Sequence, residues 1–286
     1  MSTTETRMSR DPRFNPFLGR NPFTDQYVTE ELTWYSPQPY DDGDGLTVTL
    51  HRDFGRVDDY LNRRFRVGTW DTIPILRLDG QLWMSLSPME IQSGALAITC
   101  ASGLCATAGA GLGYVALRMA EQDDVDRVDV YERDPRVVRY VQRHFAGNPA
   151  LEKVQFLLGD VREALTDQDY DYVFMDIYRG MHDDDTLTDL LHFTTRNSIA
   201  EYRFWGQERV LLDAITLGMR PELHWAERMF LCTWQDTPLE GHPEETLECL
   251  YRAQVHPSYL HRALDVMERE YTPVPYDNDE DEEDDE

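Results

Sequence analysis

Lysine is nearly absent from this sequence: of its 27 basic residues, only Lys153 is a lysine. A GC-rich coding bias or adaptation to high salt would each produce this pattern, and the two are compatible. Cysteine is also scarce, and the four cysteines form no C-x-x-C pair, which indicates reduced thiols in a cytoplasmic protein and argues against a zinc site. No apolar run approaches the ~20 residues of a membrane helix, and residues 1–20 lack the apolar core of a signal peptide. We therefore expect neither a membrane-spanning nor a secreted protein.

Negative charge dominates what the sequence does contain. Its 54 acidic residues outweigh the 27 basic ones, for a net charge of -27, and Asp277–Glu286 consists of nine acids and one asparagine. Duplex DNA is a poor partner for such a chain, because few bases are present to neutralise phosphates. A small molecule or a protein is the expected partner, and a homodimer is compatible with the sequence. With 286 residues, 41% of them apolar, the chain can bury the core of one large α/β domain or of two small ones.

The first hundred residues divide into an arm and a lead-in. Residues 1–45 are rich in Pro, Asn, Arg and Thr and are predicted to form a partly disordered, extended N-terminal arm. Residues 46–100 are predicted to hold a β-hairpin and a lead-in helix. The supporting patterns are a strand at 46–50, a hairpin at 72–86 around Asp79-Gly80, and a helix at 88–100 that begins at Pro88.

The segment 101–271 alternates strands with helices. The expected strands are 104–108, 125–132, 154–158 and 172–175, and the expected helices are 114–121 and 135–145, the second capped by Asp134. Such alternation predicts an α/β fold of the Rossmann-like type, with a mostly parallel, doubly wound sheet.

Beyond residue 176 the pattern weakens. It predicts a loop at 182–189, helices at 198–217, 243–255 and 257–270, and a fifth strand or buried helical turn at 228–234. Residues 272–286 are predicted to be a disordered acidic tail.

A glycine-rich turn follows the first strand of this domain. The segment Ala106–Ala116 reads ATAGAGLGYVA, and glycines at a strand-to-helix turn let the backbone approach a ligand closely. Gly109, Gly111 and Gly113 fit the G-x-G-x-G of adenosylmethionine binding, whereas Gly111, Gly113 and Ala116 fit the G-x-G-x-x-A of dinucleotide binding. The turn alone leaves the cofactor class open, and a plain tight turn is a third interpretation.

Three acids follow the next three strands. Glu132 ends the second strand, where a carboxylate can accept hydrogen bonds from the ribose hydroxyls of either cofactor. Asp160 follows the third, where it can face an adenine amino group or cap the next helix. Asp176 ends the fourth, where it would face the transferred group. Because the carboxyl ends of parallel strands share one edge of a sheet, these acids and the glycine turn are expected to line one site.

In order and approximate spacing, these residues resemble those of the class I S-adenosylmethionine-dependent methyltransferases, and within them the branch that contains spermidine synthase. The hairpin and Met89-Glu90 before the lead-in helix are similar to that branch as well, so the resemblance covers roughly residues 72–180. It implies S-adenosylmethionine as the cofactor and residues 101–271 as the domain that binds it. The implied contacts are Gly109, Ala110, Gly111 and Gly113 with the methionine moiety, Glu132 with the ribose, Asp160 with the adenine, and Gln81 with the cofactor or product pocket.

Two departures from the family bear on the reaction. Most methyltransferases carry an acid two residues before the first glycine, and Thr107 in its place favours the spermidine synthase-like branch. Aminopropyltransferases carry a double-acid, Gly-rich loop after the fourth strand, which here reads DIYRGM from Asp176 and argues against polyamine transfer. The first hypothesis is thus a methyltransferase acting on a small-molecule or protein acceptor. The alternatives are an aminopropyltransferase, a non-catalytic nucleotide-binding α/β scaffold and, as a remainder, an NAD-dependent enzyme.

The predicted catalytic residues are Asp176 and Tyr178. A sulfonium methyl is already electrophilic, so the protein must chiefly position the acceptor and handle its proton. Asp176 would accept that proton or hold a cationic amine, which requires it to lie near Gly113, and Tyr178 would orient the substrate. The histidines show no metal-ligand spacing, and His182 and His192 are expected to be surface or packing residues.

Overall fold

The structure is a computed structural model. It describes residue 22, the ranges 24–51, 57–58, 64–65, 72–165, 169–178 and 202–206, and residues 189 and 193. The elements predicted at 228–234, 243–255, 257–270 and 272–286, the loop at 182–189 apart from its last residue, and His182 and His192 lie outside the described residues. Within the described ranges, no helix has both the length and the apolar character needed to cross a bilayer.

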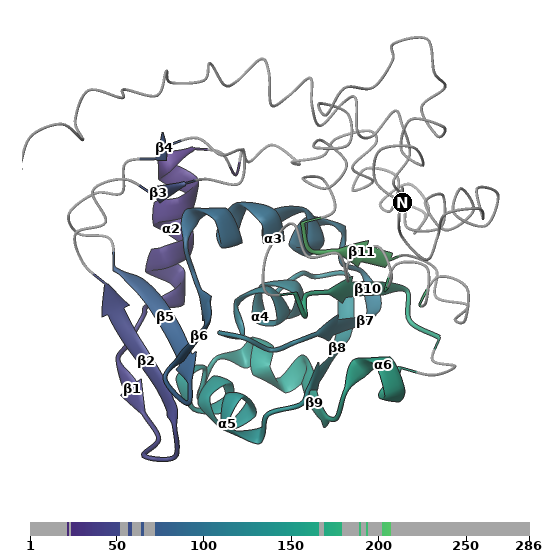
Figure 1. Cartoon of the computed structure of the whole chain (residues 1–286). Helices are drawn as coiled ribbons and strands as arrows, with labels where there is room; N and C mark the ends of the chain where they lie inside the picture. Colours follow the sequence, from purple (N-terminus) through teal and green to yellow (C-terminus); the bar gives the residue numbers. More distant parts are fainter. Residues whose placement is uncertain are drawn as a thin grey trace, which may run out of the picture.

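Five parallel strands form the larger sheet (Figure 1). They are β7 (Gly103–Ala108), β8 (Val125–Glu132), β9 (Val154–Leu158), β10 (Tyr172–Met175) and β11 (Tyr202–Phe204). Their order across the sheet is β11-β10-β7-β8-β9, and every neighbouring pair is parallel. The chain therefore runs outward from β7 to β9 and then returns to the other side of β7, so the strand order reverses between β7 and β10. This topology confirms the Rossmann-like α/β class.

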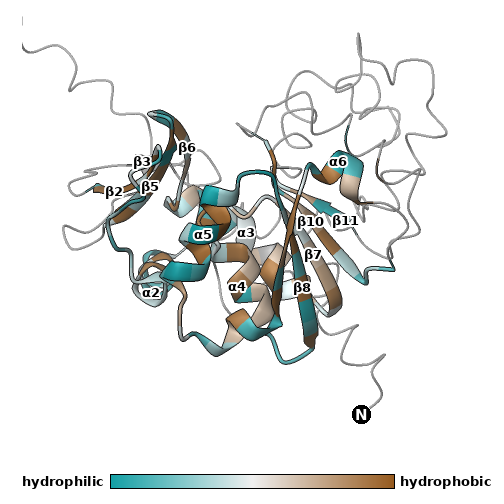
Figure 2. Cartoon of the chain, turned by 90° about the horizontal axis from the view of Figure 1, so that it is seen from below, coloured by the Kyte–Doolittle hydropathy of each residue, from teal (hydrophilic) through white to brown (hydrophobic). Residues whose placement is uncertain are grey.

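The helices around this sheet begin where the sequence predicts, except for a short 3-10 helix that was not predicted. They are α3 (Pro88–Cys100), α4 (Tyr114–Ala120), α5 (Pro135–His144), the 3-10 helix η1 (Pro149–Lys153) and α6 (Val161–Ala164). A proline in the first turn of α3 and of α5 is tolerated because its missing N–H has no partner there. Asp134 caps α5 as predicted, by accepting a hydrogen bond from Arg136 N. In Figure 2, α3, α4 and α5 lie on one side of the sheet and α6 lies on the other.

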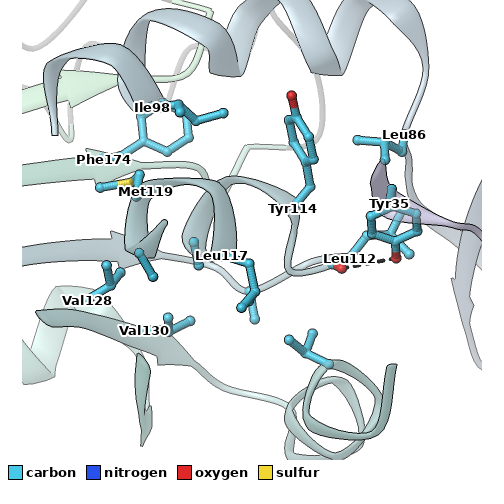
Figure 3. Packing of buried hydrophobic residues seen from close by; sticks show 14 of the residues in the cluster. Tyr35, Leu86, Ile98, Leu112, Tyr114, Leu117, Met119, Val128, Val130 and Phe174 are labelled. Atoms are coloured by element: carbon cyan, nitrogen blue, oxygen red, sulfur yellow. Dashed lines mark hydrogen bonds between the residues drawn. The ribbon is translucent and has the colours of Figure 1, made fainter. Parts of the chain in front are cut away.

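The main core lies between the larger sheet and helices α3 and α4 (Figure 3). Alternate residues of β8, Val128 and Val130, are fully buried on the face that α4 covers, where Leu117 is fully buried too. Phe174 of β10 packs next to Ile98 of α3. Each such side chain contributes about 1.5–3 kcal/mol on burial, so this interface holds α3 and α4 firmly against the strands.

A smaller antiparallel sheet lies beside the larger one (Figure 1). Its strands, in the order β1-β2-β5-β6, are β1 (Tyr40–Asp41), β2 (Leu46–His51), β5 (Ile73–Leu78) and β6 (Gln81–Ser85). Two short strands, β3 (Val57–Asp58) and β4 (Arg64–Phe65), pair only with each other among the described strands. Asp79 and Gly80, both with positive φ, form the turn between β5 and β6. The predicted hairpin and the strand at 46–50 are thus confirmed.

Helix α2 contradicts the predicted extended arm. Residues Asp25–Tyr35 are helical, begin after the N-cap Thr24, and lie next to α3. Val28, Leu32 and Tyr35 fall on one helical face and are buried in the same core as α4. The prediction was wrong because this apolar stripe is narrow and the residues around it are polar.

A buried ion pair anchors α2 to α4. Glu31 is only 1% exposed, and its two carboxylate oxygens accept hydrogen bonds from Nε and Nη2 of Arg118, at 2.9 and 3.0 Å. The hydroxyl of Tyr114 donates a third, at 3.0 Å. A carboxylate can be buried only with partners of this kind, so Glu31 belongs to the helix interface although its polarity in the sequence indicates a surface position.

Strand β11 corrects the helix predicted at 198–217. Tyr202, Arg203 and Phe204 pair with β10 in parallel register, and all three are buried. A three-residue strand has too little sequence to show a period of two, and the edge of β10 supplies its hydrogen-bond partners. The fifth strand of the described sheet is β11, and the segment predicted at 228–234 lies outside the described residues.

Candidate functional site

The predicted site residues gather at one edge of the larger sheet. The register pairs the last residues of β7 and β10 with each other, and the end of β7 with β8. Backbone hydrogen bonds continue this alignment past the strands, from Gly109 N to Tyr131 O at 2.8 Å and from Asp176 N to Ala108 O at 3.0 Å. The segment after β9 is tied in by Gly159 N, which donates to Glu132 O at 3.0 Å. The glycine turn and the three predicted acids therefore stand side by side.

Each glycine of the turn has a positive φ and contacts a different segment. Gly109 lies so close to the backbone carbonyl of Asp176 that a Cβ would overlap the oxygen. Gly113 lies against α5, where a Cβ would come within 2.6 Å of Val141 Cγ1. Close packing against α5 thus accounts for Gly113, the backbone carbonyl of Asp176 lies against Gly109, and the proximity of the Asp176 carboxyl to Gly113 stays a prediction.

Glu132 is a fixed carboxylate next to the glycine turn. It is 4% exposed; Oε2 accepts a hydrogen bond from Ala110 N at 2.9 Å, and Oε1 accepts one from Asp134 N at 2.8 Å. These two bonds orient the carboxylate and leave each oxygen with capacity for a further donor. The geometry fits a group that presents two hydroxyls side by side, as a ribose does.

Asp160 sits at the end of β9, as predicted, and caps α6. Its Oδ1 accepts a hydrogen bond from Arg162 N at 2.9 Å, and the residue is half-buried. Helix capping is the contact that the structure records for Asp160, and the adenine contact stays a prediction.

Strand β6 crosses the same edge from the smaller sheet. The sulfur of Met84 accepts a hydrogen bond from Leu112 N at 3.0 Å and fills the space that a Cβ on Gly111 would need. The guanidinium of Arg133, the residue after Glu132, lies over the ring of Trp83 at 5.1 Å from its centroid. The hairpin therefore reaches the glycine turn through Met84 and the end of β8 through Trp83.

Gln81 stands at the start of β6 and is exposed. The neighbouring hairpin turn is held at α5, where Asp79 pairs with Arg136 at 2.8 Å. This pairing fixes the hairpin tip at the start of α5, and it is Met84, three residues along the strand, that contacts the glycine turn. A cofactor contact for Gln81 stays a prediction.

Asp176 and Glu90 form an acidic group at the end of β10. Protein atoms surround the carboxyl of Asp176, and this burial raises its pKa to about 7. Burial, followed by the negative charge of Asp176, raises the pKa of Glu90 well above its ordinary value, and a hydrogen bond from Trp205 opposes the rise. Near neutral pH the carboxyl of Asp176 is therefore poised to hold or lose a proton.

Tyr178 is placed differently from the predicted substrate-orienting role. Burial raises the pKa of its phenol, and the charges of Asp189, Arg162 and Asp176 act on it in that order. Asp189 is 4% exposed and accepts hydrogen bonds from Nε and Nη2 of Arg162, at 2.8 and 2.7 Å. The phenol thus belongs to an ion-pair cluster beside α6, and its contact with a substrate stays a prediction.

Four residues of this edge escaped the sequence reasoning as site residues: Trp83, Met84, Glu90 and Trp205. Met84 and Trp83 belong to a strand that pairs in the smaller sheet, so nothing local connects them with the glycine turn. Glu90 is the one with a usable signal, because an acid in the first turn of a helix that precedes the glycine turn can reach the same edge.

No protein-family model matches the chain, and no curated protein matches it. Several solved structures match parts of the chain. A probable spermidine synthase from Corynebacterium glutamicum ATCC 13032 is 18% identical with a TM-score of 0.36, over 58% of this chain and 62% of that one. The Podospora anserina methyltransferase PaMTH1, solved with SAH bound, is 13% identical with a TM-score of 0.33, over 60% of this chain and 71% of that one. The YcgJ protein of Bacillus subtilis is 22% identical with a TM-score of 0.32, over 39% of this chain and 48% of that one.

The chain thus spans less than half the length of YcgJ. All three TM-scores lie below 0.5 and all three identities below 25%, so these likenesses say nothing of the activity. What the site does must be argued from its own geometry.

Proposed function

We propose that the protein is an S-adenosylmethionine-dependent methyltransferase that acts on a small-molecule or protein acceptor. The observation that carries the proposal is the way in which the N–H groups of the glycine turn are already used. Ala110 N donates to Glu132, Leu112 N donates to Met84, and Gly113 N donates to Ala110 O. These three N–H groups of the turn therefore already have partners within the protein.

This arrangement separates the two cofactor classes that the glycine spacing leaves open. A dinucleotide places its doubly negative pyrophosphate on the free N–H groups of the turn. Here Ala110 N, Leu112 N and Gly113 N are engaged, and Glu132 and Asp176 stand beside the turn. S-adenosylmethionine carries a positive sulfonium, which such surroundings stabilise, and no pyrophosphate.

The residues present fit the adenosyl group. The oriented carboxylate of Glu132 retains acceptor capacity for two ribose hydroxyls. Asp160 caps α6 one strand away and would face the adenine. When bound, the cofactor supplies a methyl group that is activated by its attachment to the sulfonium.

The chain's own residues would then position the acceptor and take its proton. Asp176 follows the strand at which the order reverses, the place where ligands meet such sheets. Its raised pKa lets it accept a proton at neutral pH and release it afterwards.

Titration calorimetry with S-adenosylmethionine, its demethylated product and NAD tests the proposal. We expect both adenosyl ligands to bind and NAD not to bind. Thermal unfolding gives a second measure, since a ligand at a hundredfold excess over its dissociation constant stabilises by about 2.7 kcal/mol. Binding of NAD alone, or of neither adenosyl ligand, refutes the proposal. Tighter binding of decarboxylated S-adenosylmethionine than of the parent would instead indicate aminopropyl transfer.

A further inference from the structure

Strand β6 contains a β-bulge at Trp83. On one side of the bulge, Leu82 pairs with Arg77 of β5. On the other side, Met84 pairs with the preceding residue of β5, Leu76, so the register passes over Trp83. Consecutive residues of a strand point to opposite faces, and paired residues share a face, so Leu82 and Met84 lie on opposite faces of the sheet. The exposed fractions agree, because Leu82 is 62% exposed whereas Leu76 is fully buried.

The bulge brings the side chain of Met84 to the glycine turn. Its sulfur accepts a hydrogen bond from Leu112 N at 3.0 Å and fills the position that a Cβ on Gly111 would take. The methyl carbon of Met84 lies 3.3 Å from that position. In a strand without the bulge, Met84 would share the exposed face of Leu82, because a shift of one residue moves a side chain to the other face.

The strand that carries Met84 is held at two places. At the bulge, the guanidinium of Arg133 lies over the ring of Trp83, 5.1 Å from its centroid. At the hairpin turn, the two carboxylate oxygens of Asp79 accept hydrogen bonds from Nη1 and Nη2 of Arg136, at 2.8 and 3.1 Å. These contacts fix β6 against the larger sheet, so the half-buried thioether of Met84 belongs to the wall of the turn.

A thioether at this place has two effects on what the turn can bind. It is a weak, uncharged acceptor, so it pairs with the N–H of Leu112 without adding a charge to the site. It also takes the room that the missing side chain of Gly111 leaves. A ligand that places a diphosphate on a glycine turn needs both features, namely free backbone N–H groups and a glycine that allows close approach. Met84 removes both at Gly111 and Leu112.

We propose that Met84 is a specificity-determining residue of the cofactor site, whose thioether closes the turn at Gly111 and Leu112 to ligands that carry a diphosphate. The inference rests on the proposed function and adds a cause for the choice between the two cofactor classes. Glu132, bonded to Ala110 N in the same turn, keeps its acceptor capacity for a ribose. One side chain of the smaller sheet therefore selects among ligands that share an adenosyl group.

Titration calorimetry of the full chain tests this through a ratio, the dissociation constant of NAD divided by that of demethylated S-adenosylmethionine. Met84→Ala opens the space beside Gly111 and frees Leu112 N, so we expect the ratio to fall by at least about tenfold. Met84→Leu accepts no hydrogen bond but still fills the space, and it should keep the ratio of the unaltered protein. Leu82→Ala, on the exposed face of the same strand, is the matched control and should also keep it.

The ratio distinguishes specificity from a purely structural role. A side chain that only supports the fold would weaken the binding of both ligands together and leave their ratio unchanged. Met84→Val is a second short variant, because it has no atom at the position of the sulfur and suits a strand. Far-UV circular dichroism identifies the folded variants, and the highest NAD concentration used sets the lower limit of its dissociation constant where no binding is detected.

The outcomes separate this inference from the proposed function. If a folded Met84→Ala or Met84→Val binds the demethylated product but excludes NAD as the unaltered protein does, the inference is overturned and the cofactor assignment stands. An equal fall of the ratio in Met84→Leu or Leu82→Ala also overturns it, because neither variant opens the space beside Gly111. If the unaltered protein binds neither adenosyl ligand, the proposed function itself is refuted and the inference falls with it.

Discussion

Glu132, at the end of β8, and Asp176, just after β10, lie at the same edge of one sheet, on either side of β7. The surroundings of the two carboxyls nevertheless differ. Glu132 receives a backbone N–H on each oxygen, so its carboxylate is held in one orientation. Among the described residues, none donates a hydrogen bond to the side chain of Asp176, and burial raises its pKa to about 7. The structure thus fixes the orientation of one carboxylate and raises the pKa of the other. Similar positions in a fold can thus serve binding or proton transfer, depending on the donors around them.

The largest effect should come from Gly109, which lies between these two carboxyls. In Gly109→Ala the new Cβ overlaps the carbonyl of Asp176, in addition to the strain of a positive φ. We expect a loss of about 3 kcal/mol in the free energy of unfolding and no measurable binding of adenosyl ligands. Gly147→Ala is the matched control, because Gly147 also has a positive φ but has nothing within 4 Å of its Cβ position. It should cost about 1 kcal/mol and leave binding intact; equal effects in urea unfolding and calorimetry would disprove the contact.

Glu132→Gln tests whether the oriented carboxylate of Glu132 binds the cofactor. Both oxygens of Glu132 accept backbone N–H groups, so an amide must turn its NH2 toward one of those donors. We expect a loss of about 1–3 kcal/mol in stability and about a hundredfold weaker binding of S-adenosylmethionine by calorimetry. Glu152→Gln, at an exposed position, should change stability by no more than about 0.5 kcal/mol. Unchanged affinity in Glu132→Gln would remove Glu132 from the cofactor site.

The pH dependence of the free energy of unfolding tests the raised pKa of Asp176. The folded-state pKa of Asp176 is raised, so the native protein binds more protons than the unfolded chain between about pH 4 and 7. Its contribution is therefore present at low pH and is lost as the pH rises toward 7. We expect Asp176→Asn to be more stable than the unaltered protein at pH 8, by at least about 1 kcal/mol, and similar to it at pH 4. Urea unfolding at both pH values measures this, and a variant less stable at pH 8 contradicts it.

A smaller effect of opposite sign should come from His144, on α5. Burial lowers the pKa of His144, whose ring stacks on Tyr35 and hydrogen-bonds the backbone carbonyl of that residue at 3.0 Å. The unfolded chain then binds more protons near pH 6, so the contribution of His144 to stability falls as the pH drops below about 6.5. His144→Gln should flatten this acid limb in urea unfolding, while Asp176→Asn should steepen it, because Asp176 contributes with the opposite sign in the same pH range. Acid limbs of equal slope in the unaltered protein and His144→Gln would exclude the histidine as its source.

Sequence reasoning succeeds here where local signals coincide with the elements. From β6 to β10 the strands alternate with helices, and prolines stand in the first turns of α3 and α5. Asp79-Gly80 sets the hairpin turn between β5 and β6, so these elements follow from their own residues. The glycine turn and the three acids at strand ends could be grouped because parallel strands bring their carboxyl ends together.

What the sequence could not supply depends on contacts between distant segments. Glu31 looks like a surface acid until Arg118, on another helix, pairs with it. Met84 and Trp83 belong to the smaller sheet, and only the position of the hairpin brings them to the glycine turn. Trp205 and Glu90 are neighbours because β11 pairs beside β10. A strand of three residues is too short for its sequence to predict that pairing.

The three glycines of the turn have a consequence for the energetics of recognition. Because Gly109 abuts the segment after β10, Gly111 abuts the hairpin and Gly113 abuts α5, the loop is clamped on three sides before any ligand arrives. A ligand that binds there meets a turn that is already ordered, so little conformational entropy is lost on binding. Affinity at this edge should accordingly depend on the match between ligand and loop and very little on loop rearrangement, which is the behaviour of a rigid receptor.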